Sequence, residues 1–288
     1  MHLAQIDFQA PRASQDFAES LKNTGFAVIK NHPLDYKLVA AVFKEWETFF
    51  HSDYKNNYIY NSKTMDGLFP LSVSETAVGY SLKDIKEFYH YYPWGQYPRE
   101  LTNQTKLLYC QMNELATTLL QWVEDNLPPA IKSALTEPLS AMIADSQQTL
   151  MRILHYPPLA GTEMAIRAGS HTDINLLTVL LAASQSGLQL MDSHGTWLDV
   201  PVDPGMLAIN IGDMLQEATN GFYKSTKHQV VNPSDATRLN SRYSIPLFLH
   251  PRPEVVLSTR YSAGSFLNER LIQLGQRPRR VCTAGPEL

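Results

Sequence analysis

The apolar residues in the first half of the chain recur at helical spacing. One stripe spans residues 38–50, a second spans residues 108–123, and a shorter helix is expected around residues 17–21. Pro128 and Pro129 end the second stripe, because proline lacks the amide hydrogen that a helix interior needs. A compact apolar run over residues 26–29 predicts a strand, whereas residues 52–95 are rich in Tyr, Asn, Ser and Gly and are expected to form loops. The two stripes consist of Leu38, Val39, Val42, Phe43, Trp46, Phe49 and Phe50, and of Leu108, Met112, Leu115, Leu119 and Val123.

The pattern changes after about Gln148, where short β-rich runs follow one another, separated by Pro, Gly, Asp and Asn. This spacing is typical of a sandwich or jelly roll, whose mouth can hold a site. We therefore expect a mainly β fold with flanking helices, in which residues 1–147 pack on a jelly-roll core of residues 148–288. The whole chain, residues 1–288, forms a single unit, because the helices need the outer face of the barrel to bury their stripes. The predicted strands cover residues 150–156, 176–181, 188–191, 197–200, 206–211, 228–231 and 243–249.

Composition narrows the class of protein. The 288 residues include 44% hydrophobic and 18% charged residues, as in an ordinary globular chain. A net charge of -4 and a pI of about 6.1 give no basic surface for nucleic acid. No apolar run has the length of a membrane span, and the start lacks the form of a signal peptide. Cys110 and Cys282 lie far apart and form no disulfide framework, so we expect a cytoplasmic protein.

His171, Asp173 and His228 are the candidate metal ligands. His171 and Asp173 are two residues apart, so on an extended strand their side chains point the same way. His228 opens the apolar run at residues 229–231, which places it at a strand end. Two imidazoles and one carboxylate form the facial triad of non-haem Fe(II) oxygenases, which leaves metal positions open for small molecules. The same ligands also bind zinc, so a Zn(II) hydrolase is an alternative.

Arg242 and Ser244 form a candidate anion anchor. They alternate onto one face of a predicted strand, where the planar guanidinium can grip a carboxylate and the hydroxyl can donate a hydrogen bond. A buried arginine without an anion would be costly in a barrel lumen, so the pair implies a ligand that carries a carboxylate. The alternative is an ion pair with an Asp or Glu of the chain itself.

Several motifs together resemble the isopenicillin N synthase-like branch of the 2-oxoglutarate and Fe(II)-dependent oxygenases, and they span nearly the whole chain. The resemblance implies a distorted double-stranded β-helix, which is a jelly roll, with His171, Asp173 and His228 as iron ligands. It also implies that Arg242 and Ser244 hold the distal carboxylate of 2-oxoglutarate, and that O2 is the oxidant. The motifs are GFAVIKNH at 25–32, GTWLDVP at 195–201, PG at 204–205, NIGD at 210–213, TNG at 219–221, HQVVNP at 228–233 and FLNERL at 266–271.

Residues 154–157, Leu-His-Tyr-Pro, correspond to a family motif that often has asparagine in its first position. Tyr156 matches the tyrosine that helps to bind the carboxylate of 2-oxoglutarate. Leu154 stands in the place of the asparagine and cannot donate a hydrogen bond. The departure keeps open an Fe(II) oxidase of the same fold that does not use 2-oxoglutarate and whose Arg242 and Ser244 grip the substrate's own carboxylate.

The prime substrate is expected near an aromatic run at residues 88–94. In the family, segments from this region lie near the mouth of the site, so Tyr89 and Tyr91 are candidates for a substrate wall; the alternative is a loop pinned on the barrel by its aromatic rings. Phe248 shares a strand face with Arg242 and Ser244 and is a third candidate. The NIGD segment at 210–213 is expected to serve the scaffold as a strand followed by a turn.

The resulting functional hypothesis is an Fe(II)- and 2-oxoglutarate-dependent dioxygenase. It would hydroxylate, desaturate or cyclise a small organic molecule and release succinate and CO2. A jelly-roll binding module without catalysis is the alternative from another class, and the open metal positions argue against it.

Overall fold

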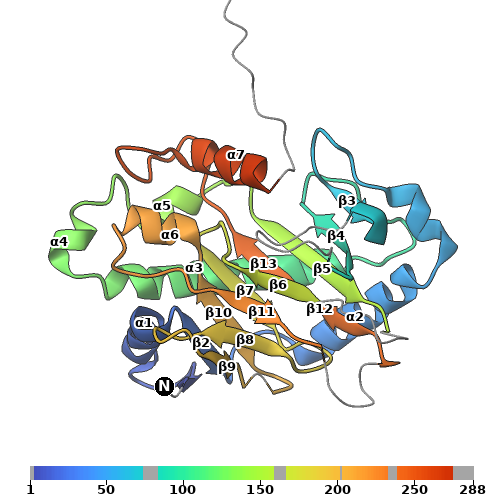
Figure 1. Cartoon of the computed structure of the whole chain (residues 1–288), viewed down its shortest axis with the longest axis horizontal. Helices are drawn as coiled ribbons and strands as arrows, with labels where there is room; N and C mark the ends of the chain where they lie inside the picture. The colour runs from blue at the N-terminus through green and yellow to red at the C-terminus, as the bar shows by residue number, and fades with distance from the viewer. Residues whose placement is uncertain (1–2, 74–83, 159–166, 202, 233–238, 275–288) are drawn as a thin grey trace, which may run out of the picture.

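The strands form two sheets that pack face to face (Figure 1). The computed structural model describes residues 3–73, 84–158, 167–201, 203–232 and 239–274. Within these ranges the larger sheet has nine strands in the order β1-β2-β10-β7-β13-β5-β4-β3, with β12 also paired to β5, and the smaller sheet has the order β6-β11-β8-β9. The strands of the larger sheet are β1 (Gln5–Asp7), β2 (Phe26–Lys30), β3 (Gly67–Phe69), β4 (Glu87–Tyr91), β5 (Leu150–Tyr156), β7 (Leu177–Leu181), β10 (Leu207–Ile211), β12 (Arg242–Ser244) and β13 (Pro246–Leu249). Those of the smaller sheet are β6 (Ala168–His171), β8 (Leu188–Met191), β9 (Trp197–Asp199) and β11 (His228–Val230).

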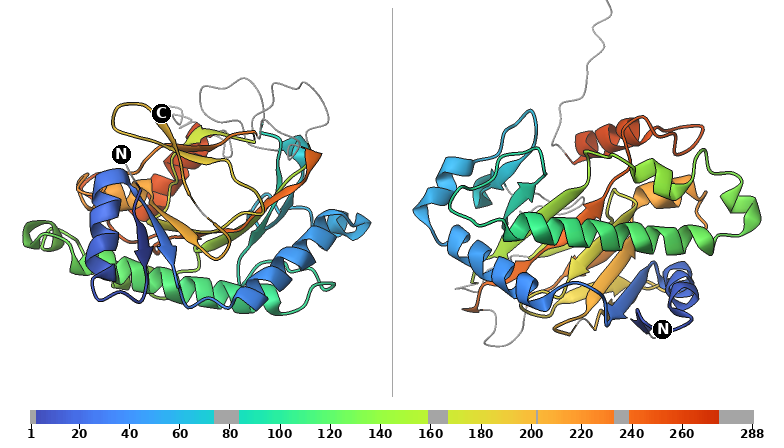
Figure 2. Two further views of the ribbon diagram at one scale, coloured as in Figure 1. Left: turned by 90° about the horizontal axis from the view of Figure 1, so that it is seen from below. Right: turned by 180° about the vertical axis from the view of Figure 1, so that it is seen from behind.

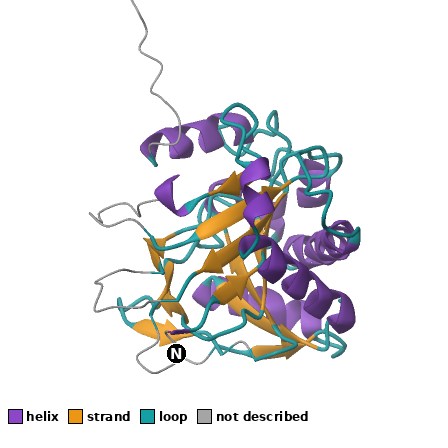
Figure 3. Cartoon of the chain, turned by 90° about the vertical axis from the view of Figure 1, so that its right-hand side faces the viewer, coloured by secondary structure: helices purple, strands orange, loops and turns teal. Residues whose placement is uncertain are grey.

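The helices lie mainly to one side of the strands (Figure 3). This arrangement confirms the predicted β-rich core with flanking helices. No described helix has the length and apolar character needed to cross a membrane. The helices are α1 (Ala13–Thr24), α2 (Tyr36–Phe50), α3 (Gln104–Asp125), α4 (Pro129–Lys132), α5 (Leu139–Ile143), α6 (Asp213–Ala218) and α7 (Ala263–Gln273), with short 3-10 turns η1 (Asp53–Tyr58) and η2 (Leu71–Val73).

Helix α3 covers the outer face of the larger sheet and contacts β7 and β13. Seen from behind, it crosses in front of the strands, and α1 and α2 pack against it (Figure 2). All five residues of its predicted stripe are buried, which confirms the helical spacing found in the sequence. Burial of each such large apolar side chain contributes on the order of 1.5–3 kcal/mol. The stripes therefore attach the helices to the outside of the barrel and leave its inside for other side chains.

The start of α2 shows how the sequence sets a helix boundary. The carboxylate of Asp35 accepts hydrogen bonds from the backbone amides of Lys37 and Leu38 and so satisfies two donors of the first turn. From there the predicted stripe buries Val42, Trp46, Phe49 and Phe50.

The segment expected to be a loop, residues 52–95, instead contributes two strands to the larger sheet. Strand β4 pairs antiparallel with β5, with Tyr89 opposite Ile153, and β3 pairs with β4. The expectation was wrong because β5, the hydrogen-bond partner of β4, lies about sixty residues further along the chain. Such a long-range pairing cannot be predicted from local sequence. Strands from the part before residue 148 thus belong to the same sheet as β5, β7, β10 and β13.

Alternate side chains along a strand of the larger sheet point to opposite faces of the sheet, one of which packs under the helices. On β5, Met151 and Ile153 belong to the core beneath the helices, whereas Leu154 and Tyr156 belong to a separate cluster on the other face. We call the space between the two sheets the lumen. The alternation of period two therefore decides which side chains can reach a ligand there.

Candidate functional site

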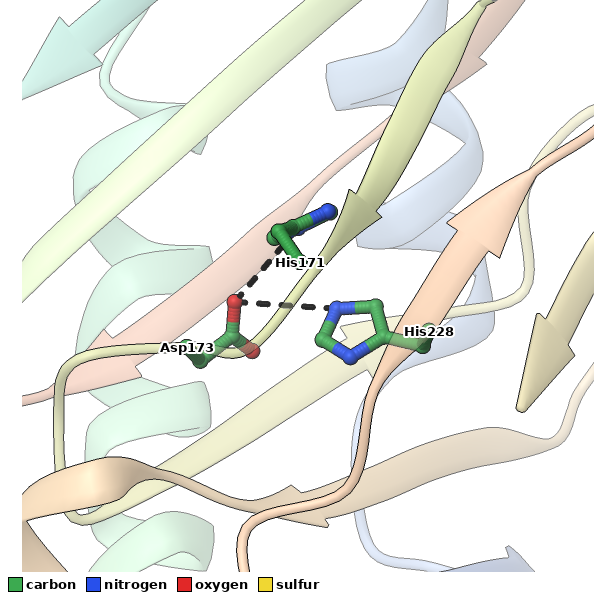
Figure 4. A group of neighbouring side chains, drawn as sticks. All are labelled: His171, Asp173 and His228. Atoms are coloured by element: carbon green, nitrogen blue, oxygen red, sulfur yellow. Dashed lines mark ion pairs between the residues drawn. The ribbon is translucent and has the colours of Figure 1, made fainter. Parts of the chain in front are cut away.

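The three predicted metal ligands come together inside the lumen (Figure 4). His171 ends β6 and lies directly opposite His228, which begins β11, while Asp173 follows in the loop after β6. The Asp173 Oδ1 atom lies 3.8 Å from His171 Nε2 and 3.6 Å from His228 Nε2. One possible ligand atom from each residue lies within 4.8 Å of the others. This spacing suits coordination of a single ion.

Backbone carbonyls orient both imidazoles. His171 Nδ1 lies 2.8 Å from the carbonyl oxygen of Gly169, and His228 Nδ1 lies 3.2 Å from that of Thr226. A carbonyl oxygen only accepts hydrogen bonds, so each Nδ1 carries the proton and donates it. In the neutral ring, Nε2 then keeps its lone pair, which is the arrangement that supports metal-binding histidines.

Two side chains that the sequence did not single out hold the carboxylate of Asp173. Thr178 Oγ1 and Asn210 Nδ2 donate to Asp173 Oδ2 over 2.6 Å and 2.8 Å. Burial raises the pKa of Asp173. The charges of His228 and His171 and these two hydrogen bonds lower it by more, so the pKa lies below its usual value. The carboxylate is therefore ionised, with Oδ1 as the atom near both imidazoles.

Asn210 belongs to the NIGD segment that was assigned to the scaffold, so that assignment missed its contact with the site. A signal was present, because asparagine is the polar residue in the otherwise apolar β10 run Leu-Ala-Ile-Asn-Ile. A polar side chain in such a buried strand needs a partner. Gly212 serves the scaffold as expected, since a Cβ at this position would collide with the backbone carbonyl of Asn175.

The surroundings also keep His171 neutral. Burial, with the neighbouring charge of His228 in second place, lowers the pKa of His171 to about 4. Its side chain nevertheless keeps 42% of its surface accessible, so the site opens outward at this residue. Two imidazoles and one carboxylate form a donor set that fits Fe(II), and the same set would accept Zn(II).

The anion anchor is buried and has an unused donor. Arg242 is 2% exposed and faces Tyr156 across the β12–β5 pair, with its Cζ atom 5.1 Å from the ring centroid. Its Nε donates to the backbone oxygen of Gln185 over 3.2 Å, whereas its Nη1 is buried without a partner. Ser244 lies two residues further along the same face and is 4% exposed. Among the described residues no carboxylate forms an ion pair with Arg242, so the arrangement fits a bound carboxylate rather than an internal ion pair.

A polar network supports the anchor from the opposite face of β5. His155 Nδ1 lies 2.9 Å from Glu87 Oε1, and His155 Nε2 lies 3.0 Å from Ser241 Oγ. His155 also stacks on Tyr243 with ring centroids 4.9 Å apart. Because His155 precedes Tyr156 and Ser241 precedes Arg242, these contacts join the two strands at the point where the anchor sits.

Leu154 lies directly opposite Ser244 in the β12–β5 pair. It is buried in an apolar cluster with Phe69, Phe88 and Tyr156. The position that carries asparagine in many family members is thus part of an apolar patch beside the anchor.

The structure corrects the expectation for Tyr89 and Tyr91. Both rings are buried in the core beneath the helices, where Tyr89 contacts Trp46 with centroids 4.9 Å apart and Tyr91 contacts Tyr109. Alternation along β4 turns these odd-numbered side chains away from the lumen. The sequence could not show which face of β4 meets the lumen, because both faces carry aromatic residues and both are buried.

The lumen side of β4 carries Phe88 and His90 instead. The guanidinium of Arg152 on β5 lies 4.5 Å from the Phe88 ring centroid and 5.4 Å from that of Phe248, and its Nε donates to His90 Nε2 over 2.9 Å. Phe248 is half-buried and lies opposite Thr178 in the β13–β7 pair, so it sits beside the residue that holds Asp173. Phe248 is therefore on the lumen face, as its shared strand face with Arg242 and Ser244 predicted.

Comparisons with known proteins agree with this geometry. The model of the 2OG-Fe(II) oxygenase superfamily matches residues 147–251, and a model described as the N-terminal region of non-haem dioxygenases in morphine synthesis matches residues 3–110. A solved structure of a Shewanella oneidensis protein assigned as an oxygenase is 50% identical, with a TM-score of 0.87, and the match covers 96% of this chain and 99% of that one.

Two curated relatives have names that describe oxidation reactions. The clavatol oxidase of Penicillium crustosum is 28% identical over 306 residues, covering 90% of this chain and 87% of the relative. The bifunctional coumaroyl CoA and feruloyl CoA ortho-hydroxylase of Ruta graveolens is 28% identical over 259 residues, covering 87% of this chain and 68% of the relative. From the family models, the solved oxygenase and these relatives it follows that the chain belongs to the 2-oxoglutarate/Fe(II)-dependent oxygenase superfamily and is a dioxygenase that uses Fe(II), 2-oxoglutarate and O2.

Proposed function

We propose that His171, Asp173 and His228 bind the ferrous ion of this dioxygenase, and that Arg242 and Ser244 bind the distal carboxylate of 2-oxoglutarate. The observation that carries the proposal is the pairing of two features in one lumen. Three ligand atoms lie within 4.8 Å of one another, and a buried guanidinium has a free Nη1 donor. A zinc hydrolase would leave that buried donor without a use.

The chain's own residues bind and orient the reactants. When bound, the metal, O2 and 2-oxoglutarate supply the oxidising chemistry, with succinate and CO2 as products. Arg242 offers a planar fork that selects a carboxylate, and its Nε bond to the Gln185 carbonyl fixes the plane of that fork. Tyr156 lies against the guanidinium and limits where the carboxylate can sit.

We infer that the prime substrate is a small, planar or aromatic molecule that is hydroxylated. Support comes from Phe248, which is half-buried, faces the lumen and can stack against a ring. The relative named as an ortho-hydroxylase favours hydroxylation over ring closure. Arg152 lies between the rings of Phe248 and Phe88 and contributes positive charge to this wall.

The test is metal binding and 2-oxoglutarate-dependent O2 uptake in the Asp173→Ala variant. Because this substitution removes the charged ligand, we expect the variant to bind Mn(II) weakly and to form no succinate. Asp125→Ala is the matched control, since the Asp125 side chain is 54% exposed at the end of α3. Normal succinate formation by Asp173→Ala would refute the ligand assignment. O2 uptake by the unaltered protein without 2-oxoglutarate would refute the role of Arg242.

A further inference from the structure

Arg167 is a second fully buried arginine near the anion anchor. Its residue surface is 0% exposed, and it lies immediately before β6. Nη1 donates to Gln185 Oε1 over 2.9 Å and Nη2 donates to the backbone oxygen of Asn240 over 3.3 Å, whereas Nε is buried without a partner. Arg167 therefore resembles Arg242 in having an unused buried donor.

Gln185 connects the two arginines. Its side-chain oxygen accepts from Arg167, and its backbone oxygen accepts from Arg242 over 3.2 Å. Asn240, the other partner of Arg167, lies two residues before Arg242 in the chain. Both guanidinium groups thus bond to Gln185, and they lie close enough for the charge of Arg242 to act on Arg167.

The charges in this part of the lumen are not balanced by the chain. Burial, and then the charge of Arg242, lower the pKa of Arg167, and only Tyr156 acts in the opposite direction. Within the described residues, no Asp or Glu forms an ion pair with either arginine. Two neighbouring buried cations without a counter-charge are costly, and one anion between them would offset the cost of both.

The pair lies at the end of the lumen away from the metal ligands. In the β6–β11 ladder, His171 is opposite His228, and Ala168 is opposite Val230 at the other end. Arg167 precedes Ala168, so its backbone lies four residues from that of His171, a distance of about 13 Å along a strand. An elongated ligand that reaches from the metal toward Arg242 therefore ends where Arg167 is.

We propose that Arg167 is a second anchor for the distal carboxylate of 2-oxoglutarate, acting together with Arg242. This inference rests on the proposed function. The two arginines, one immediately before β6 and one on β12, would enclose the carboxylate and would make binding depend on a ligand with acidic groups at both ends. Arg167 is thus a residue that determines co-substrate specificity.

The test is calorimetric titration of the Mn(II)-loaded protein with two ligands. 2-Oxoglutarate carries the distal carboxylate, and 2-oxopentanoate has the same keto-acid end with a methyl group in place of that carboxylate. In Arg167→Met we expect the Kd for 2-oxoglutarate to rise about ten- to a hundredfold, because a hydrogen bond between charged groups is lost. The Kd for 2-oxopentanoate should change little. Arg167→Lys keeps the charge but not the fork, so its Kd for 2-oxoglutarate should lie between those of the other two proteins.

The comparison of two ligands in one protein separates binding from folding. A damaged fold would weaken both ligands equally, and retained Mn(II) affinity shows that the triad is intact. Arg99→Met serves as the matched control, because the Arg99 side chain is 88% exposed. The role of Arg167 would be overturned if Arg167→Met and Arg167→Lys changed the Kd values of both ligands equally, or changed neither. In that case Arg242→Met would still weaken the binding of 2-oxoglutarate selectively. If the unaltered protein showed no preference for 2-oxoglutarate, the proposed function itself would fail, and this inference with it.

Discussion

Asn210 donates a hydrogen bond from Nδ2 to Asp173 Oδ2 over 2.8 Å, and thereby joins the middle of β10 to the loop that carries the candidate carboxylate ligand. Thr178 on the neighbouring strand β7 holds the same oxygen. The carboxylate is thus fixed by two adjacent strands of the larger sheet, while both imidazoles come from the smaller sheet. The site depends on the spacing between the two sheets.

This arrangement predicts that the supporting residues tune metal affinity. Thr178→Val and Asn210→Ala should each weaken Mn(II) binding about 10- to 100-fold, because the carboxylate loses the donor that orients it. Competition with a chelator measures the change. Thr118→Val is the control, since Thr118 is only half-buried on α3, and its hydroxyl donates to the Glu114 carbonyl within its own helix. Unchanged affinity in both site variants would show that Asp173 needs no support from β7 and β10.

Gly212 is expected to be intolerant of even one added carbon. In Gly212→Ala, the new Cβ would press on the backbone of Asn175, two residues after Asp173, and we expect a loss of about 1–3 kcal/mol in unfolding free energy together with weaker Mn(II) binding. Gly195→Ala is an informative control, because Gly195 has a φ of 80° but open space around it. That variant should lose stability through backbone strain and keep its metal affinity. Thermal melts and metal titration distinguish the two effects.

His250 should make the stability of the metal-free protein depend on pH. Burial lowers the pKa of His250 from 6.5 to about 4, so the unfolded chain takes up its proton first as the pH falls. The unfolding free energy should stay level above pH 6.5 and decline between 6.5 and 4. This residue accounts for a decline of about 2 kcal/mol between roughly pH 7.5 and pH 5.

Urea unfolding of His250→Gln in the presence of a chelator tests this contribution. The variant should show a shallower decline with acid than the unaltered protein, because one buried neutral histidine has been removed. His194→Gln removes a histidine from an exposed turn and should leave the decline as it was. If the unfolding free energy fell with pH along parallel curves in all three proteins, the prediction would be contradicted.

Tyr89→Phe tests the corrected placement of β4. The Tyr89 hydroxyl donates to the backbone oxygen of Gln96 over 2.8 Å within the core, so its removal should cost about 1 kcal/mol of unfolding free energy. Mn(II) and 2-oxoglutarate affinities should not change, because the ring faces the helices. Weaker binding of either one with unchanged stability would place Tyr89 at the site after all.

Local sequence determined the elements and the chemistry of this protein. The helical stripes predicted α2 and α3, because their periodicity is a property of a single segment. The two-residue spacing of His171 and Asp173 is also a local feature. Together with His228 at a predicted strand end, it indicated the triad. The extended strand expected to carry both His171 and Asp173 is β6, but it ends at His171, so Asp173 lies in the loop that follows.

The tertiary structure decided which face of each strand meets the lumen and which distant residues share a site. Tyr89 and Phe88 are adjacent and both aromatic, yet only pairing with β5 sends one to the helices and the other to the lumen. The approach of Arg167 to Arg242 likewise comes from a contact through Gln185 between segments far apart in the chain. Periodicity is local, whereas burial and charge balance depend on partners that folding brings together.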